Sequence, residues 1–351
     1  VTGAGGSIGS QLSLRIVGLG VKRLILVDNS EIALHQIEQS TREVMAELET
    51  PPECVSVLGS VQNVDVIEEV LREYDVDSVF HTAAFKHVPI VEKHPLAGIA
   101  NNVLATELLA RACVEHHVER FVLVSTDKAV RPASVMGATK RLAELIIQGF
   151  AATQNETIFT AVRFGNVPES SGSVVGIFRH QINSGGPVTV TDRNVVRYFM
   201  SLEETTNLVL QAAGMAVGGE VFVLDMGLPV KIDDLARSMI RLMGLEERTP
   251  NNPEGDIEIS YIGLRRGEKL VEELVIAEQN ASDTQHPRIW KSHEPSVDPE
   301  ALAKELELLK SAVRFRSVAM ALTSLSRIIE GYTPAASRRE EVRLPEKIVL
   351  H

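Results

Sequence analysis

The sequence predicts an α/β fold, in which a doubly wound parallel sheet is followed by a smaller α+β domain. Three observations predict it. The first 165 residues alternate short apolar runs with helical stretches, and a glycine-rich turn opens the chain. After residue 166, glycine and serine interrupt this pattern. A length of 351 residues leaves room for two domains.

The expected strands of the first part are short and apolar. Val, Leu, Ile and Phe dominate most of them without polar alternation, as in parallel strands that are buried on both faces. We expect these strands at residues 24–28, 54–58, 78–82, 120–125 and 158–163. Helical patterns lie around and between them, at residues 7–20, 31–49, 64–74, 96–117 and 138–152.

The second part carries fewer and more widely spaced elements. We expect helices near residues 202–215 and 232–243, and strands at 220–224 and 256–261. Asp298 followed by Pro299 is typical of a helix start and predicts a helix to about residue 311. The expected domains are residues 1–165, a smaller domain over 166–330 with segments that return to the first, and a charged tail over 331–351.

The composition argues against several functional classes. The formal net charge is −12, which disfavours nucleic acid as the main partner. The two cysteines, Cys54 and Cys113, are too few for a disulfide framework and fit a cytoplasmic, reducing compartment. We expect no metal, because the histidines of the first part lack a compact ligand spacing: His81, His87, His94, His116 and His117.

The chain opens on what reads as the last step of a strand. Val1-Thr2-Gly3 runs directly into a turn, whereas a strand normally takes ~5 residues. We therefore expect this chain to be part of a longer protein. No apolar run reaches the ~20 residues of a membrane-spanning helix. The sequence leaves open whether a segment upstream of Val1 anchors the protein to the inner face of the cytoplasmic membrane.

Glycines 3, 6 and 9 stand between that strand and the first helix. Glycine there permits a tight turn and a close backbone approach to a pyrophosphate, and the helix N-terminus offers N–H groups to the phosphates. Asp28 ends the next strand, where a carboxylate accepts hydrogen bonds from ribose hydroxyls and repels a 2′-phosphate. The pattern favours NAD over NADP. The alternatives are an ordinary tight turn and a helix-capping role for Asp28.

A polar cluster follows the apolar strand that ends near residue 124. Ser125-Thr126-Asp127-Lys128 lies at a carboxyl strand end, where ligands bind in open α/β sheets. Met136 and Lys140 share a face of the next helix. Their spacing is that of the Tyr-x-x-x-Lys pair of short-chain dehydrogenases, with methionine in the tyrosine position. The alternatives are a solvated ion pair, a core methionine and an exposed lysine.

These motifs, with four more blocks in the same order, carry a family resemblance. The blocks lie at residues 81–89, 163–167, 197–200 and 263–270, and the match covers roughly residues 1–290. The chain resembles the UDP-N-acetylglucosamine 4,6-dehydratases of bacterial polysaccharide synthesis, which are extended short-chain dehydrogenases with a Rossmann sheet. The similarity is greatest to the long membrane-anchored forms that carry methionine in place of tyrosine.

The resemblance implies a chemistry for the cluster. NAD⁺ takes hydride from sugar C4, a base removes the C5 proton, water leaves from C6, and the hydride returns to C6. By resemblance Lys128 is the C5 base and Asp127 the acid at O6, and Lys140 contacts the nicotinamide ribose. A thioether cannot shuttle the O4 proton, so Met136 leaves that role to Asp127, directly or through water or Thr126, or else impairs the first step.

The resemblance also implies the binding residues and a homo-oligomer. The cofactor would contact Gly3, Gly6, Ser7, Ile8, Gly9, Asp28, Asn29, Ser60, Val61, Ala83, Ala84, Lys86, Asn102, Ser125 and Lys140. The UDP-sugar would contact Lys86, His87, Asn166, Arg197, Arg265 and Glu268. The chain departs from the family pattern at Ser60 and at Pro168-Glu169. The alternatives are a nucleotide-sugar 4-epimerase and a non-catalytic NAD-bound scaffold.

Overall fold

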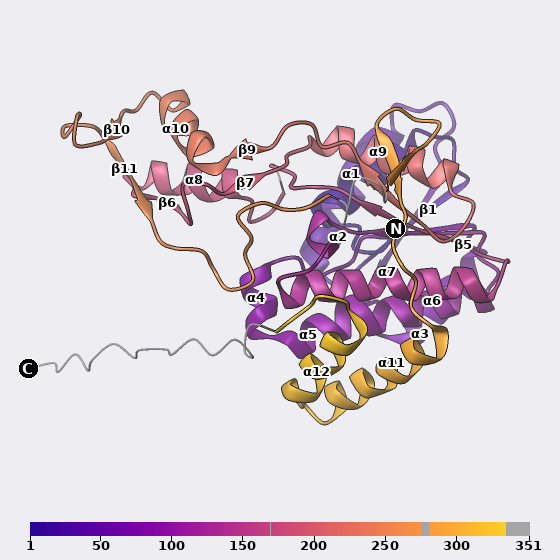
Figure 1. The fold of residues 1–351 in the computed structure, drawn as a ribbon. Coiled ribbons are helices and arrows are strands. Elements are labelled where there is room, and N and C mark those ends of the chain that lie inside the picture. Colours follow the sequence, from indigo (N-terminus) through magenta and orange to yellow (C-terminus); the bar gives the residue numbers. More distant parts are fainter. Residues whose placement is uncertain (169, 275–280, 335–351) are drawn as a thin grey trace, which may run out of the picture.

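A computed structural model describes residues 1–168, 170–274 and 281–334, and it confirms the predicted α/β fold (Figure 1). Its main sheet has six strands in the order β12-β13-β8-β5-β4-β3. The parallel members are β3 (Ser78–His81), β4 (Arg120–Val124), β5 (Ile158–Arg163) and β8 (Glu220–Leu224). At one edge β13 (Ile289–Ser292) and β12 (Ala281–Asp283) run antiparallel.

The start of the chain connects this sheet to a second parallel pair, β1 (Arg23–Asp28) and β2 (Glu53–Leu58). Thr2 forms parallel bridges to Val27 of β1 and to His81 of β3, in the position of a strand between them. The chain therefore builds β1 and β2 on one side of Thr2 and the other strands on the opposite side. A sheet whose strand order reverses in this way binds ligands at the point of reversal.

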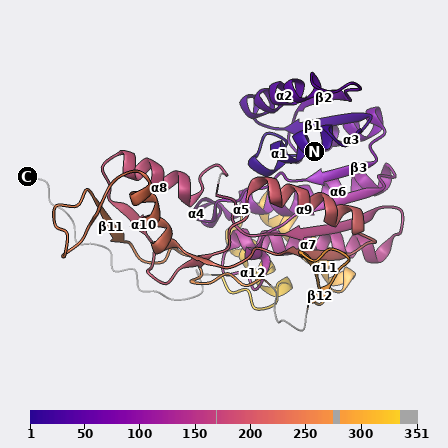
Figure 2. The same ribbon diagram turned by 90° about the horizontal axis from the view of Figure 1, so that it is seen from above.

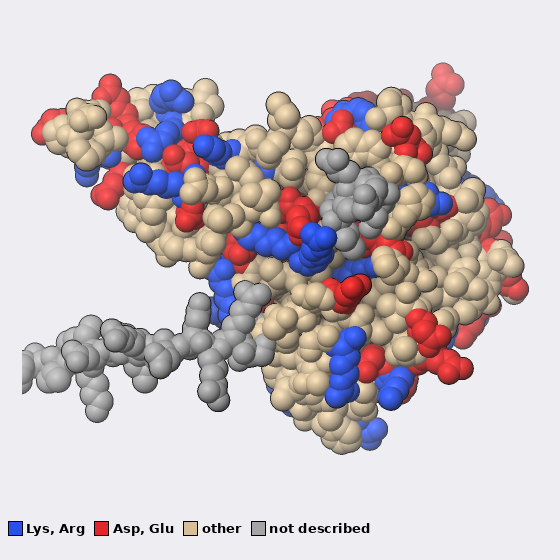
Figure 3. Space-filling model, in the orientation of Figure 1, with Lys and Arg blue, Asp and Glu red and all other residues tan. Residues whose placement is uncertain are grey.

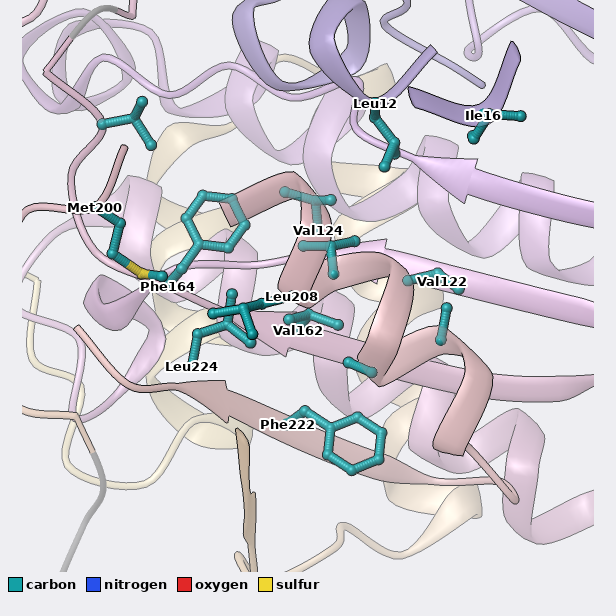
Figure 4. Packing of buried hydrophobic residues seen from close by; sticks show 14 of the residues in the cluster. Leu12, Ile16, Val122, Val124, Val162, Phe164, Met200, Leu208, Phe222 and Leu224 are labelled. Carbon is teal, nitrogen blue, oxygen red and sulfur yellow. The ribbon is translucent and has the colours of Figure 1, made fainter. Parts of the chain in front are cut away.

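Helices cover both faces of the sheet (Figure 2). One face carries α1 (Ser7–Val17), α2 (Glu31–Met45) and α9 (Leu202–Met215). The other carries α3 (Val64–Tyr74), α6 (Ala105–Glu115) and α7 (Val135–Thr153). Strand β4 explains why no polar alternation was visible in the sequence. Its Val122 and Val124 pack under α1 and α9 (Figure 4), and Phe121 and Leu123 pack into the opposite layer.

A helical hairpin thickens the second face. Helices α11 (Pro299–Arg314) and α12 (Val318–Ile328) pack on α7 and on α5 (Pro95–Ile99). Leu302, Leu306 and Leu309 recur at helical spacing and are buried against this face. Asp298 caps α11 by accepting a hydrogen bond from Ala301 N at 2.9 Å, as its sequence predicted.

A small lobe projects from the body in both ribbon views (Figure 1, Figure 2). It contains α8 (Val174–Asn183), α10 (Ile232–Leu242) and the parallel strands β10 (Glu247–Arg248), β11 (Ile257–Tyr261) and β6 (Val188–Val190). Its own core gathers Phe178, Ile182 and Ile240, among others. The antiparallel pair β7 (Val196–Arg197) and β9 (Val230–Lys231) leads into it.

The structure corrects one element prediction and adds elements that the sequence did not predict. The helix expected over residues 96–117 is α5, a π-helical turn (Ala100–Leu104) and α6, preceded by a separate α4 (Val88–Lys93). Helices α8 and α12 were not predicted. Helix α8 starts with two β-branched residues and contains Gly176, which lowers its helix propensity, and burial of Phe178 and Ile182 stabilises it instead. Within the described residues no helix is long and apolar enough to cross a membrane.

Candidate active site

Two adjoining cavities lie where the strand order reverses, at the carboxyl ends of the central strands. The first has a volume of about 170 Å³ and lies between the glycine turn, Asp28 and the ends of β2 and β3. The second has a volume of about 650 Å³ and extends from the first turn of α1 toward the small lobe. Gly6 and Ala84 belong to the walls of both cavities.

The glycine turn has the shape that the sequence predicted. Gly3 has a φ of +67°, and a Cβ there would lie 2.7 Å from the backbone of Ala83. Gly9 packs directly against the carbonyl oxygen of Gly3, where a Cβ would overlap it. Gly6 is the N-cap of α1, and no side chain of the described residues caps this helix. The N–H groups of its first turn therefore face the cavities without a side-chain acceptor.

Asp28 combines the two functions that the sequence left open. Its carboxylate accepts hydrogen bonds from Gly5 N and from Ser30 N, each at 2.9 Å, so it ties the glycine turn to the start of α2. It also lines the first cavity. The expected cofactor residues that line this cavity are Gly3, Gly6, Asp28, Asn29, Ser60, Val61, Ala83 and Ala84.

Most of the other expected site residues line the second cavity. They are Ser7, Ile8, Gly9, Lys86, His87, Ser125, Thr126, Lys128, Met136, Lys140, Asn166, Arg197, Arg265 and Glu268. Asn102 lies behind the wall, where its amide exchanges hydrogen bonds with the backbone of Phe85 at 2.8 and 3.0 Å. Asp127 also lies behind it and is fully buried.

Asp127 and Lys128 form an ion pair at the end of β4. Lys128 Nζ lies 2.9 Å from Asp127 Oδ1 and donates a second hydrogen bond to Asn166 Oδ1 at 3.1 Å. Thr126 donates to the same carboxylate oxygen at 2.9 Å. Asp127 Oδ2 is buried and has no hydrogen-bond partner among the residues that the structure describes. Oδ1 of Asp127 is therefore held in place by two donors, and Oδ2 is able to accept a hydrogen bond from a further donor.

Helix α7 carries Met136 and Lys140 beside this pair. Gly137 allows the helix to approach the carbonyl oxygen of Lys128, which a Cβ would overlap. Met136 is 3% exposed and belongs to the apolar cluster under α11 and α12, although it also reaches the cavity wall. Lys140 is 6% exposed and donates to the Val124 carbonyl at 2.6 Å. Burial lowers the pKa of Lys140 to about 8.

Burial lowers the pKa values of two residues beside the site, Lys86 and His87. In addition to burial, the charge of Lys86 lowers the pKa of His87. Both line the second cavity. A cation with a lowered pKa releases its proton more readily than in water, so these residues add titratable groups to the wall.

Arg197 is engaged by the protein itself. Its guanidinium donates to the carbonyl oxygens of Val196, Lys269 and Leu270 at 2.7, 2.9 and 3.2 Å. It also pairs with Glu268 Oε1 at 3.2 Å. These contacts hold the segment 268–270 against the cavity. By contrast, the Arg265 guanidinium is exposed and makes no hydrogen bond within the described ranges.

A buried ionic network behind the site was not predicted from the sequence. Fully buried Arg163 binds Glu144 at 2.6 and 2.7 Å and also pairs with Glu294. Ser125 donates to Glu144 Oε1 at 2.6 Å, so the network reaches the cavity wall. Burial alone would raise the pKa of Glu144, but Arg163 and Arg141 hold it at about 2. The only sequence signal was a charged residue at the end of an apolar strand.

Glu272 was also not predicted. It is 5% exposed, lines the second cavity and makes no hydrogen bond or ion pair with any described residue. Burial raises its pKa. Its signal in the sequence was an acidic pair inside the apolar stretch 270–274. No group of three or more potential metal ligands occurs in the described part of the chain.

Comparison with protein families gives one clear match. The family model described as "Polysaccharide biosynthesis protein" matches residues 1–294. The chain belongs to this family. The capsular polysaccharide biosynthesis protein CapD of Staphylococcus aureus is 48% identical over 275 residues, which are 78% of this chain and 44% of CapD. The probable polysaccharide biosynthesis protein EpsC of Bacillus subtilis is 42% identical over 82% of this chain and 46% of its own length.

The chain thus spans about half the length of these two curated relatives. A UDP-glucose 4-epimerase of Rickettsia canadensis is 34% identical over 80% of this chain and 78% of its own. Among solved structures, Pen from Bacillus thuringiensis is similar with a TM-score of 0.73 and 27% identity, over 90% of this chain and 96% of Pen. MoeE5 in complex with UDP-glucose and NAD has a TM-score of 0.58 and 25% identity, over 76% and 85%.

Proposed function

We propose that the protein is an NAD-dependent 4,6-dehydratase that converts UDP-N-acetylglucosamine to a UDP-4-keto-6-deoxy sugar for a surface polysaccharide. The observation that carries the proposal is the Asp127–Lys128 ion pair, which stands at the carboxyl end of β4 beside the larger cavity. A carboxyl group and an amine at one site supply the acid and the base that elimination of water requires. The family description and the relatives in capsule synthesis support the product class.

The residues present fit NAD. The glycine turn leaves no room for a Cβ at Gly3 or Gly9, and α1 presents uncapped N–H groups to the cavities. Asp28 keeps lone pairs for ribose hydroxyls beyond its two backbone contacts, and its charge disfavours a 2′-phosphate. MoeE5 binds UDP-glucose and NAD together, which supports the same pairing here. When bound, NAD accepts hydride from sugar C4 and returns it to C6.

The chain's own residues move the protons. Asp127 takes the proton from O4 as C4 is oxidised, because the Met136 thioether cannot accept it. Lys128 then acts as the base that removes the C5 proton, whose acidity the C4 ketone increases. A carboxyl group of the site protonates the C6 hydroxyl so that it leaves as water. Lys140, beside the Val124 carbonyl, holds the nicotinamide ribose.

Arg265 is the residue best suited to the diphosphate of the substrate. Its guanidinium is exposed at the cavity and has five donors available for phosphate oxygens. Arg197 and Glu268 act together with it by fixing the segment that carries Arg265. Glu268 Oε2 accepts a hydrogen bond from Arg265 N at 3.0 Å. Lys86, His87 and Asn166 complete the sugar side of the cavity.

A second candidate is a nucleotide-sugar 4-epimerase, which the 34% identity to the Rickettsia enzyme favours. Epimerisation through a transient C4 ketone needs no base at C5, so it gives Lys128 no task. Liquid chromatography coupled to mass spectrometry, applied to UDP-N-acetylglucosamine incubated with the protein and NAD, separates the candidates by retention time and mass. A dehydratase gives a product that has lost water, an epimerase gives an isobaric isomer, and a non-catalytic scaffold leaves the sugar unchanged.

A further inference from the structure

Two adjacent carboxylates, Glu272 and Glu273, have opposite surroundings. Glu273 is at the surface and pairs with Arg131 at 2.8 Å and with Lys269 at 2.9 Å. Although partial burial acts against it, Lys269 and Arg131 hold the pKa of Glu273 below its usual range. Glu272 faces inward, is 5% exposed and has neither an ion pair nor a hydrogen bond within the described residues. One of the pair fastens the segment, and the other is presented to the cavity.

The backbone around Glu272 is held on both sides. Arg197 binds the carbonyl oxygens of Lys269 and Leu270, and Lys269 Nζ donates to the Val130 carbonyl at 3.1 Å. The segment is therefore tied to β7 and to the loop that follows Lys128. A carboxyl group on a segment clamped in this way keeps a fixed position relative to the Asp127–Lys128 pair.

The charged groups that face Glu272 come from three elements. Lys128 and Asp127 lie at the end of β4, Arg197 lies on β7, and Lys269 belongs to its own segment. Burial raises the pKa of Glu272 and the negative charge of Asp127 raises it further, whereas the three cations lower it, and the sum is a rise. One carboxylate, Asp127, thus lies behind the cavity wall and is paired with a lysine, and one carboxyl group, Glu272, lines the cavity and has a raised pKa.

We propose that Glu272 is a second proton-transfer residue of this site, which protonates the oxygen that leaves C6 while Asp127 takes the proton from O4. The assignment rests on the proposed dehydration. Two carboxyl groups in surroundings that separate their protonation states are the usual arrangement of an acid and a base at one site. Without Glu272, Asp127 has to serve both O4 and O6, because Met136 exchanges no proton.

The protons balance over one turnover. The O4–H bond breaks and its proton goes to Asp127, and the C5–H bond breaks and its proton goes to Lys128. The C6–O bond breaks as the Glu272 O–H proton passes to the departing oxygen, which leaves as water. Lys128 returns its proton to C5 after C6 has received hydride. The proton on Asp127 then passes through the released water to the Glu272 carboxylate, which restores the starting state.

Glu272→Gln tests the assignment, with Glu273→Gln as the matched control on the same segment. Each protein is mixed with NAD and UDP-N-acetylglucosamine, and both NADH absorbance and loss of water by mass spectrometry are followed in a single turnover. In Glu272→Gln we expect NADH to form within about threefold of the normal rate while water loss slows ~10²–10⁴-fold. Glu273→Gln should keep both rates at saturating sugar, because Arg197 and Lys269 still hold the segment through the carbonyl oxygens of Lys269, Leu270 and Val130. Copurified NAD and circular dichroism report whether the variant is folded.

The pH dependence provides a readout that a structural role would not change. In the wild type, water loss should slow as pH rises through the raised pKa of Glu272, because the acid loses its proton. Glu272→Gln should lack this limb, and Glu272→Asp should recover part of the rate together with the limb. Asp also serves as the second variant if Gln fails to fold.

Three outcomes would overturn the assignment. They are water loss at the wild-type rate in Glu272→Gln, an equal fall of NADH formation and water loss, or an unchanged alkaline limb. The failure of the proposed function looks different, because the wild type itself would then lose no water from the sugar, even where NADH forms as it does in an epimerase. In that case the proposed role of Glu272 is also wrong, because it depends on the proposed dehydration.

Discussion

The two walls of the larger cavity are built by different means. One wall is the end of β4 together with α7, where Asp127, Lys128 and Lys140 stand on regular elements that are packed into the main sheet. The opposite wall is the segment 264–273, which has no regular structure and depends on side-chain clamps such as Arg197. Figure 3 shows acidic and basic side chains interspersed over this face, with both signs gathered where the small lobe meets the body.

The two walls differ in how strongly their geometry depends on the stability of the fold. A buried network under the first wall makes its geometry a property of the whole fold. The second wall can change its side chains, or its position, at a smaller cost to folding, since its ion pairs of Glu273 with Arg131 and Lys269 lie near the surface. Changes in the first wall should therefore affect chemistry and folding, and changes in the second, apart from those at Glu272, should mainly affect binding.

The largest effect on the reaction is expected at Lys128 in the first wall. Lys128→Met should keep the fold and the bound NAD but stop exchange of the C5 proton with solvent deuterium, because the base is removed. A missing general base costs ~10²–10⁴-fold in rate. Deuterium incorporation measured by mass spectrometry checks this. Residual activity above about a tenth of the wild-type value would remove Lys128 from that role.

Glu144 tests the network that supports the same wall. Glu144→Gln leaves the fully buried charge of Arg163 without its main partner, and breaking such a pair costs about 3–5 kcal/mol in the free energy of unfolding. Urea unfolding at pH 7 measures it. Glu307→Gln, which breaks an exposed pair with Lys310, should have a much smaller effect, because solvent screens the pair. Equal effects of the two variants would contradict the comparison.

The same network predicts a pH dependence of stability. Although burial acts in the opposite direction, Arg163 and Arg141 hold the pKa of Glu144 in the folded chain at about 2, below its ordinary value of 4.5, so the stability that it adds is complete above about 4.5. This stability is lost as pH falls through 4.5 toward 2. The difference in unfolding free energy between wild type and Glu144→Gln should therefore shrink over that range.

The sequence predicted the first wall better than the second for a physical reason. Strand β4, the polar run that follows it and the Met136/Lys140 spacing are local patterns. Regular strands and helices fix the relative positions of such nearby residues, so the sequence spacing predicts where the side chains lie. Glu272 and the Arg163 network depend on contacts between residues far apart in the chain. Glu144 and Glu294, for example, lie close together because each binds both Arg163 and Arg141. Such partners are invisible until the fold brings them together.

Arg197 tests the second wall, where the expected effect is smaller. Lysine keeps the charge but loses the fork that binds Lys269 and Leu270 at once, so Arg197→Lys should loosen the segment that carries Glu268 and Arg265. Loss of one or two such hydrogen bonds, about 1–2 kcal/mol, corresponds to roughly tenfold in KM for the UDP-sugar. Steady-state kinetics should show a smaller fall in kcat than rise in KM, because the same clamp also positions Glu272. A fall in kcat without a change in KM would place Arg197 with the first wall.

Met136 should give the smallest effect, although it occupies the tyrosine position of the catalytic pair. Its side chain is buried among apolar residues of α7, α11 and α12 and only fills the wall. Met136→Leu preserves volume and polarity, and such exchanges usually cost under about 1.5 kcal/mol in stability. Most of the activity should remain.

The contrast variant for Met136 is Asp127→Asn, which keeps the shape of the carboxyl group but cannot accept a proton. If Asp127 has taken over the O4 proton, this variant should abolish the first hydride transfer, so that single-turnover absorbance shows no NADH. Accumulation of NADH in Asp127→Asn would mean that another group deprotonates O4. A dead Met136→Leu would give the sulfur a role beyond packing, since leucine differs from methionine there mainly in lacking a weak acceptor. The two variants together therefore decide whether the chemistry of the first wall depends on the carboxylate or on the residue in the tyrosine position.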